Sequence, residues 1–362
     1  MNCFLQNEKK RRAGMLFKGL TPVMLLPAMF LSVVLLSGCG REEAALLRKT
    51  DTAMGTMVSQ SIYVREESDD SPAEAVMDII RSLEEDTLSW RLETSEIYRI
   101  NSREETVLSP ELSEILQTCL TVSEKSGGAF DVTIGALARL WNMDAWAADR
   151  EKVQLPKKEQ VLEALSLCGY EKLSEGNFSR KEEAPASLSL PDGMQLDLGA
   201  VGKGMALDEI ARLLAGREEV TGAVVSVGGS ILTYGEKPDK SSFKVAIVNP
   251  SDTASNIGYL KLQGQWCIST SGDYERFVET DGKKYHHILD PHTGFPSESG
   301  VSSVTILSKN GLLSDALSTA CFVLGAEEGI ALAEEFGTEA LFVDNGGNIS
   351  MTEGMEQYFH LY

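Results

Sequence analysis

Apolar residues recur at helical spacing in six stretches of the chain. The first of them follows a Ser-Pro pair and repeats its apolar positions every three or four residues. Two glycines, Gly127 and Gly128, close the second stretch, and Pro156 precedes the third. This pattern predicts helices over residues 72–85, 111–125, 157–167, 204–215, 314–323 and 327–336.

Between these helices lie short apolar segments bounded by turn residues, which predict strands. They cover residues 57–64, 222–232, 243–248, 257–262, 266–269, 274–279, 285–289, 301–307 and 339–343, with two more inside 171–196. Mixed helices and strands indicate an α+β fold. No Pro/Ser-rich linker interrupts residues 52–362, so we expect one folded unit.

One weak internal echo is present. Residues 225–231 and 342–349 both read as a strand that runs into a Gly-Gly turn. Two related halves and a chance similarity of two strand-turn units explain this equally well.

The N-terminal pattern differs from the rest. A basic segment (residues 9–12) precedes an apolar run over about residues 20–36, and Leu-Ser-Gly-Cys ends it at Cys39. This layout is typical of a secretory signal peptide. A run of about 17 residues is also just long enough for an uncleaved membrane anchor. Two prolines in the run, and a cysteine directly after small residues, favour the signal peptide.

Leu-Ser-Gly-Cys resembles a bacterial lipobox, which implies a lipid on Cys39. We therefore expect a signal peptide over residues 1–38, a lipidated tether over 39–51 and a catalytic domain over 52–362. The expected location is extracytoplasmic, with the lipid holding the protein at the bacterial cell membrane.

Composition and charge narrow the function. At 43% hydrophobic and 24% charged, the 362-residue chain is globular in composition. Its formal net charge of -21 argues against nucleic acid as a partner, and loss of residues 1–38 would deepen it to -25. An anionic ligand would need positive charge from a few local groups or from a metal ion.

Four cysteines remain after Cys39, at positions 119, 168, 267 and 321. They are widely spaced and form no CxxC pair, so the spacing fits no zinc site. Buried free thiols are the expected state, with a disulfide as the alternative in an oxidising compartment.

Residues 197–204 form the first segment with chemical potential, Asp-Leu-Gly-Ala-Val-Gly-Lys-Gly. Three glycines let backbone N–H groups approach a ligand closely, the following helix adds its positive dipole, and Lys203 adds a charge. The segment is neither a Walker A loop nor a GxGxxG fingerprint. A tight structural turn explains it equally well on its own.

Residues 315–319 form the second segment. Asp315, Ser318 and Thr319 share one helix face, and their oxygens suit Mg²⁺. The alternative is helix capping by Ser314 or Asp315, with Thr319 bonded back to a carbonyl.

The third segment, residues 286–294, holds three of the four histidines of the chain. A histidine at a strand end near an aspartate is a plausible general base at neutral pH. The segment has no HExxH motif that would bind zinc. Histidines in a surface turn, without a catalytic role, are the alternative interpretation. Residues 268–274 and 127–133 add a hydroxyl-rich turn and a glycine turn, each of which also reads as ordinary structure.

Six motifs occur in one order along the chain. They are Gly-Gly-Ala-Phe-Asp-Val-Thr (127–133), Asp-Leu-Gly-Ala-Val-Gly-Lys-Gly (197–204), Ser-Val-Gly-Gly-Ser (226–230), Ser-Thr-Ser-Gly-Asp-Tyr (269–274), His-Ile-Leu-Asp-Pro-His-Thr-Gly (287–294) and Asp-Ala-Leu-Ser-Thr-Ala (315–320). The series resembles the ApbE-like FAD:protein FMN transferases, from Met54 to about Val343. The resemblance implies a single α+β domain of that family, with mixed or antiparallel sheets and flanking helices.

The resemblance also implies a Mg²⁺-dependent enzyme that moves FMN from FAD to a Ser or Thr of another protein and releases AMP. The metal would be held by the Ala200 carbonyl, Asp315 and Thr319, with Ser318 beside them. His287 would activate the acceptor hydroxyl. The implied FAD site is Met54, Ala129, Phe130, Asp131, Asp197, Lys203, Ser271 and Leu289.

A family position that often holds tyrosine corresponds here to Ser89-Trp90-Arg91, so we expect Trp90 to stack on the flavin, with Arg91 as a weaker alternative. The family's acceptors carry an Asp-x-x-Ser/Thr motif. This chain has no convincing copy, so the expected acceptor is a different protein. Two alternatives remain: an FAD pyrophosphatase that releases FMN and AMP, and a lipoprotein that binds a flavin or another solute without catalysis.

Overall fold

The computed structural model describes residues 45–65, 71–143, 154–174, 177–181 and 184–362. The predicted signal peptide, the predicted lipid site Cys39 and the start of the predicted tether lie outside these residues. Within the described ranges, no helix is both long and apolar enough to cross a membrane.

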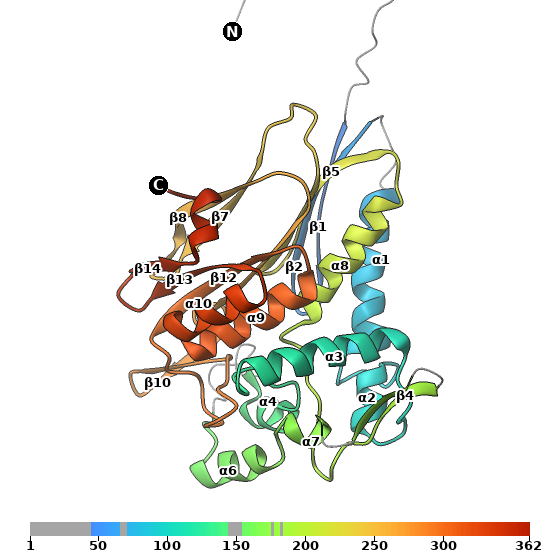
Figure 1. Ribbon diagram of the computed structural model, residues 1–362, viewed down its shortest axis with the longest axis vertical. Coiled ribbons are helices and arrows are strands. Elements are labelled where there is room, and N and C mark those ends of the chain that lie inside the picture. The colour runs from blue at the N-terminus through green and yellow to red at the C-terminus, as the bar shows by residue number, and fades with distance from the viewer. Residues whose placement is uncertain (1–44, 66–70, 144–153, 175–176, 182–183) are drawn as a thin grey trace, which may run out of the picture. The chain divides into compact units, whose positions relative to one another are not determined.

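An eight-stranded antiparallel sheet organises the protein (Figure 1). Its strands, in spatial order, are β1 (Ala45–Ala53), β2 (Thr56–Val64), β5 (Val220–Val227), β6 (Ser230–Gly235), β9 (Trp266–Gly272), β12 (Val301–Ser308), β13 (Glu339–Asp344) and β14 (Ile349–Met351). Smaller sheets hold β15 (Phe359–Leu361), β8 (Asp252–Leu262) and β7 (Phe243–Asn249); β10 (Phe277–Thr280) and β11 (Lys283–His286); and β3 (Phe178–Lys181) and β4 (Ala184–Leu188).

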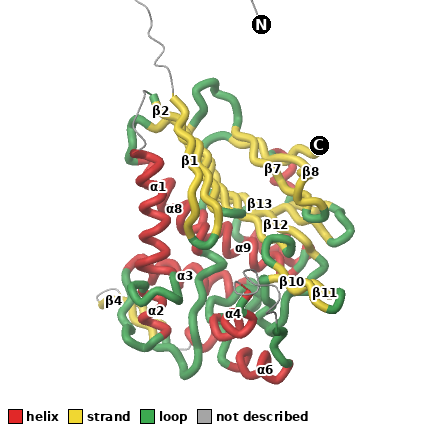
Figure 2. The backbone as a smooth tube through the Cα atoms, turned by 180° about the vertical axis from the view of Figure 1, so that it is seen from behind, coloured by secondary structure: helices red, strands yellow, loops and turns green. Residues whose placement is uncertain are grey.

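The central strands are apolar on both faces, because each face covers a separate core. Neighbouring residues of a strand point to opposite sides. On β12, Ile306 packs into the larger core under the helices, whereas Leu307 packs into the smaller core with β7 and β8. Cys267 and Ile268 divide in the same way on β9. Figure 2 shows β7 and β8 beside β12 and β13 from behind.

Helices cover the other face and build the lower part of Figure 1. They are α1 (Ser71–Ser82), the π-helix η1 (Leu83–Leu88), α2 (Glu96–Asn101), α3 (Pro110–Lys125), α4 (Gly135–Trp141), α6 (Lys158–Ser166), α7 (Glu171–Ser174), α8 (Gly202–Ala215), α9 (Gly311–Leu324), α10 (Ala326–Glu335) and the 3₁₀ helix η3 (Glu353–Gln357). The expected α+β class, with antiparallel sheets and flanking helices, is confirmed.

Several boundary predictions need correction, and the predicted strand 222–232 is in fact the two strands β5 and β6. The predicted tether 39–51 overlaps β1, whose residues from Ala45 onward pair with β2, so these residues belong to the sheet. Helix α9 begins at Gly311 rather than at residue 314. Its N-cap is Asn310, which accepts a hydrogen bond from Leu313 N, so the alternative explanation, capping by Ser314 or Asp315, is wrong.

The two Gly-Gly turns of the internal echo both join antiparallel strand pairs of the central sheet, β5 with β6 and β13 with β14. This placement is equally compatible with both explanations of the echo. Cys119, Cys168, Cys267 and Cys321 are buried free thiols, as predicted.

Candidate functional site

Helices α8 and α9 approach each other through two glycines. A Cβ on Gly204 would lie 2.1 Å from the carbonyl oxygen of Gly311, and one on Gly311 would lie 2.2 Å from that of Gly204. Gly204 is therefore required for helix packing. The third glycine of the 197–204 segment serves the core rather than a ligand.

Each of these helices receives a carboxylate from the other near its N-terminus. Gly204 N donates to Asp315 Oδ2 at 2.8 Å. In return, Asp208 accepts hydrogen bonds from Gly311 N at 2.6 Å and from Leu312 N at 2.9 Å. Both contacts satisfy backbone donors that have no partner within their helix, and both place negative charge at the positive end of a helix dipole.

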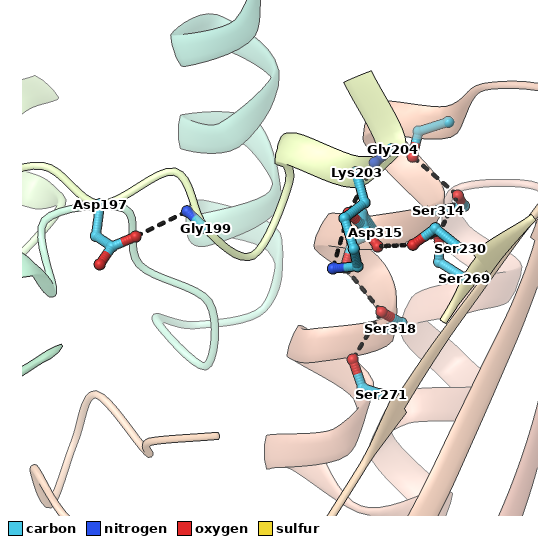
Figure 3. A network of polar contacts seen from close by, with 11 residues as sticks. Asp197, Gly199, Lys203, Gly204, Ser230, Ser269, Ser271, Ser314, Asp315 and Ser318 are labelled. Carbon is cyan, nitrogen blue, oxygen red and sulfur yellow. Dashed lines mark hydrogen bonds and ion pairs between the residues drawn. The ribbon is translucent and has the colours of Figure 1, made fainter. Parts of the chain in front are cut away.

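Asp315 lies at the centre of a polar network (Figure 3) and is only 3% exposed. Its Oδ1 accepts a hydrogen bond from Ser230 Oγ at 2.8 Å, and Lys203 Nζ lies 3.6 Å from its Oδ2. Elements α8, α9 and β6 thus meet at one carboxylate.

Serine hydroxyls continue the network along α9 and β9. Ser318 Oγ donates to the carbonyl oxygen of Asp315 at 2.9 Å and lies 2.8 Å from Ser271 Oγ. Ser269 and Ser314 pair in the same way at 2.8 Å. The structure therefore brings together Lys203, Ser271, Asp315 and Ser318.

Among the residues expected to hold the metal, Asp315 is the one that carries a carboxylate. The others offer hydroxyl or carbonyl oxygens, which are also hard donors. Within the described ranges, no group of three or more His, Cys, Asp or Glu residues is arranged to hold a metal ion. Thr319 lies one turn beyond Asp315 on the same helix, and both Thr319 and Ala200 are half-buried. Such a donor set fits Mg²⁺ when waters and substrate phosphates complete its coordination.

His287 follows β11, and its ring is uncharged at neutral pH. Burial, together with the nearby cations Arg276 and Lys203, lowers the pKa of His287 to about 3, so the ring is neutral at physiological pH. Its Nδ1 lies 3.2 Å from the carbonyl oxygen of Arg276. Because a carbonyl only accepts, Nδ1 carries the proton and Nε2 carries the lone pair.

The other two histidines of this segment have different environments. His286 is buried, donates from Nε2 to Ser297 O at 2.9 Å, and accepts at Nδ1 from Ile288 N, so both ring nitrogens hold local structure. His292 is exposed and contacts Asp290 and the carbonyl of Gly127. Of the three histidines in this segment, His292 is therefore the one that lies in a surface turn.

The 127–131 segment is a left-handed turn after α3, with φ of 60° at Gly127 and 91° at Gly128. Asp131 is buried and accepts hydrogen bonds from Thr133 N, Thr133 Oγ1 and Tyr170 N. Ala129 and Phe130 are also buried. Their side chains, like that of Leu289, pack within the protein, so these positions first serve the structure of their own loops.

Met54 stands in the turn between β1 and β2 with φ of 50°, followed by Gly55 at 65°. The N–H of Met54 donates to Glu84 Oε2 at 2.8 Å, which links the turn to the π-helix. A cavity of about 410 Å³ lies here, lined by residues 52–57 and Glu84.

Trp90 carries two guanidinium groups on its ring. The Cζ atoms of Arg91 and Arg139 lie 4.0 and 4.7 Å from the ring centroid. Burial lowers the pKa of Arg139, and the carboxylate of Asp197 opposes that shift. Asp197 Oδ1 accepts from Gly199 N at 2.7 Å, and Figure 3 shows this pair apart from the Asp315 network. Arg139 thus links Trp90 to Asp197 in a second cluster of side chains.

Comparison with known proteins identifies the family. The model of the ApbE family matches residues 54–342. The chain belongs to the ApbE family. An FAD:protein FMN transferase of Treponema pallidum is 33% identical over 319 residues, covering 84% of this chain and 86% of that protein. One from Escherichia coli K12 is 32% identical over 242 residues, covering 67% of each.

Solved structures of ApbE proteins share the fold. The crystal structure of the Thermotoga maritima ApbE protein matches with a TM-score of 0.76 and 31% identity, covering 87% of this chain and 99% of that one. The apo Pseudomonas stutzeri flavinyl transferase ApbE matches with a TM-score of 0.71 and 28% identity, covering 87% and 96%. The resemblance found in the sequence is confirmed, and this ApbE-family protein is a transferase.

Several residues of this ApbE site were given no role by the sequence, although Ser230 belongs to one of the six motifs. Ser230 donates a hydrogen bond to Asp315, and Asp208 accepts one from Gly311 at the start of α9. The two residues of each pair are more than 80 positions apart in the chain. Glu84 contacts Met54 because α1 continues into a π-helix, which apolar spacing did not reveal. Glu275 lies near Lys203 and Asp315, and burial raises the pKa of its carboxyl.

Proposed function

We propose that this protein is a Mg²⁺-dependent FAD:protein FMN transferase that attaches FMN to a Ser or Thr of a partner protein and releases AMP. The observation that carries the proposal is the neutral His287 near Lys203, whose ammonium is paired with the buried Asp315. The proposed base therefore lies near the ammonium group that would bind the phosphates. The names of the curated relatives support the transfer of FMN from FAD to a protein.

His287 serves as the base in this proposal. The acceptor oxygen forms a bond to the phosphorus of the FMN half, and the bond from that phosphorus to the bridging oxygen breaks. AMP leaves with the bridging oxygen, while the hydroxyl proton passes to Nε2 of His287. A Ser or Thr hydroxyl is a weak nucleophile, so the neutral ring supplies the activation that it needs.

Lys203, in the first turn of α8, would face the phosphates of FAD and supply positive charge there. Mg²⁺ would be held by Asp315, Thr319 and the Ala200 carbonyl, with Ser318 beside them, and when bound it would neutralise charge on the phosphate oxygens. Because Asp315 is the one carboxylate in this set, the substrate phosphates should contribute strongly to metal affinity.

The remaining FAD contacts follow the family positions Met54, Trp90, Ala129, Phe130, Asp131, Asp197, Ser271 and Leu289. Several of these side chains are buried, so FAD would meet the backbone of their loops or the rim beside them. Arg139, packed on Trp90, adds positive charge near Asp197. This local charge is what an acidic protein needs to bind an anionic substrate.

We also propose that the protein works outside the cytoplasm, held at the membrane by a lipid on Cys39. The support is the order of basic segment, apolar run and Leu-Ser-Gly-Cys in the sequence. An acceptor with an Asp-x-x-Ser/Thr motif would then be exposed on the same side of the membrane.

The reaction is tested by following the products. The protein is incubated with FAD and Mg²⁺, with and without an acceptor that carries the motif, and AMP and free FMN are separated by chromatography. Transfer predicts AMP release that depends on acceptor, without an equal amount of free FMN. Equal amounts of AMP and FMN with or without acceptor would indicate the pyrophosphatase. If neither AMP nor FMN formed, the protein would be a binding protein without catalysis.

A further inference from the structure

His292 belongs to a rigid turn that follows the proposed base. Its backbone N–H donates to Asp290 Oδ1 at 2.9 Å, and Gly294 N donates to Asp290 O at 2.8 Å. The indole Nε1 of Trp141, a buried residue of α4, donates to Gly294 O at 2.8 Å. The turn is thus anchored on both sides of His292, which fixes the direction of its side chain.

The imidazole of His292 meets an acceptor at each nitrogen. Nδ1 lies 3.0 Å from Asp290 Oδ1, and Nε2 lies 2.9 Å from the carbonyl oxygen of Gly127. A carboxylate and a carbonyl both only accept, so the two contacts together require both ring nitrogens to carry protons. The geometry therefore selects the imidazolium form.

The contact with Gly127 joins two motifs that are 165 positions apart. One is the left-handed turn at Gly127 and Gly128, which leads into the proposed FAD positions 129–131. The other is the segment from His287 to Gly294. A carbonyl at the end of α3 also lies at the negative end of that helix dipole, which favours a cation there.

We propose that His292, as an imidazolium, is a positioning residue that holds the 127–131 loop against the 287–294 segment, so that FAD affinity depends on its charge. This inference rests on the proposed function, because it takes both loops to line the FAD site. His292 acts through the loops and has no part in the chemical step.

The charges around His292 support this form. Hydrogen bonding to the Gly127 carbonyl, followed by the bond to Asp290, raises the pKa of His292, and the negative charge of Glu171 on α7 acts in the same direction. Tyr170 lies beside Gly128, and burial raises its pKa, so it stays neutral. A raised pKa means that the contact is complete below about pH 6.5 and is lost as the pH rises through the higher value.

The experiment measures the dissociation constant of FAD by fluorescence between pH 6 and 9, on the full-length protein with Mg²⁺ and without acceptor. His292→Arg keeps a permanent cation, and His292→Gln removes the charge. The control is His360→Gln, which changes a ring of β15 that is stacked on Tyr259 of β8. His287 does not interfere, because its pKa of about 3 lies far below this range.

For the wild type and the control we expect affinity to fall roughly three- to tenfold from pH 6 to pH 9, as one charged hydrogen-bonded contact is lost. His292→Arg should stay tight across the range, and His292→Gln should be weak throughout. Wild-type pH dependence persisting in His292→Arg would overturn the inference, as would wild-type affinity of His292→Gln at pH 6. Should His292→Gln not fold, the Arg variant alone decides.

This result is separable from the proposed function. Absence of FAD binding by every form at every pH would contradict the proposed function itself. Binding without AMP release in the presence of acceptor would contradict the transfer reaction, yet it would leave the role of His292 measurable.

Discussion

The backbone N–H of Gly204 donates to Oδ2 of Asp315 across 2.8 Å, joining the first turn of α8 to the second turn of α9. This bond fixes the carboxylate that we assign to the metal. It depends on the close approach of the two helices, because a side chain on Gly204 would collide with the backbone of Gly311.

Gly204→Ala should therefore destabilise the protein strongly. The new Cβ would lie 2.1 Å from the Gly311 carbonyl oxygen, and backbone at that distance must move. We expect a loss of about 3 kcal/mol in the free energy of unfolding, measured by urea denaturation. Gly216→Ala at the C-cap of α8 is the control, since its nearest contact is 3.5 Å and the loss should stay below about 1 kcal/mol. Equal effects would refute the packing role.

Lys203→Met should destabilise the protein before any substrate is present. It removes the counter-ion of a carboxylate whose side chain is 4% exposed, while that of Lys203 is 23% exposed. The expected cost is about 2 to 4 kcal/mol in the free energy of unfolding without metal. Lys261→Met, at an exposed position of β8, should change little. A stable Lys203→Met protein would show that Asp315 does not need this partner.

Asp315→Asn should abolish stabilisation by Mg²⁺ in the presence of FAD. The amide keeps the size of the side chain but loses the charge that a hard cation needs. In thermal melts of the wild type with FAD, Mg²⁺ should raise Tm, and excess EDTA should reverse the rise. A Mg²⁺-dependent rise that persists in Asp315→Asn would place the metal elsewhere.

His287→Gln should keep FAD binding but reduce transfer by about 10²- to 10⁴-fold, because the acceptor hydroxyl loses its base. The neutral wild-type ring should leave the rate free of a His287 titration until the pH approaches about 3. Rates and FAD dissociation constants measured in parallel separate the two effects. Unchanged transfer would eliminate His287 as the base.

The same histidine affects acid stability. Burial lowers its pKa in the folded state, so between its ordinary value and about pH 3 the unfolded chain binds a proton that the folded protein does not. The stabilising contribution is present above the ordinary pKa of about 6.5 and is lost as the pH falls toward 3. Tm should therefore fall less steeply on acidification in His287→Gln than in the wild type.

The sequence predicted those elements whose buried apolar residues form one continuous stripe. Helices α3 and α8 were found because their apolar residues repeat at helical spacing. Strand β1 was missed because it lies at the edge of the sheet, and its residues are half-buried or exposed except at Ala53. The start of α9 was missed because a glycine follows its cap at Asn310.

The candidate site was predictable only in part, for a physical reason. The motif containing Asp315 is local in sequence, but its environment comes from Ser230, Lys203 and Gly204, which are brought to it by the fold. No periodicity marks such partners. Family resemblance supplied the grouping of the motifs, and the structure added Asp208, Glu84 and the contact of His292 with Gly127.

The central claim is the covalent transfer of FMN to another protein, and the mass of the acceptor tests it most directly. An acceptor with an Asp-x-x-Ser/Thr motif is incubated with the protein, FAD and Mg²⁺, and its intact mass is measured beside its Ser/Thr→Ala variant. We predict one added FMN phosphoryl group on the acceptor and none on the variant. An acceptor of unchanged mass, in a reaction that releases both FMN and AMP, would contradict the transferase assignment.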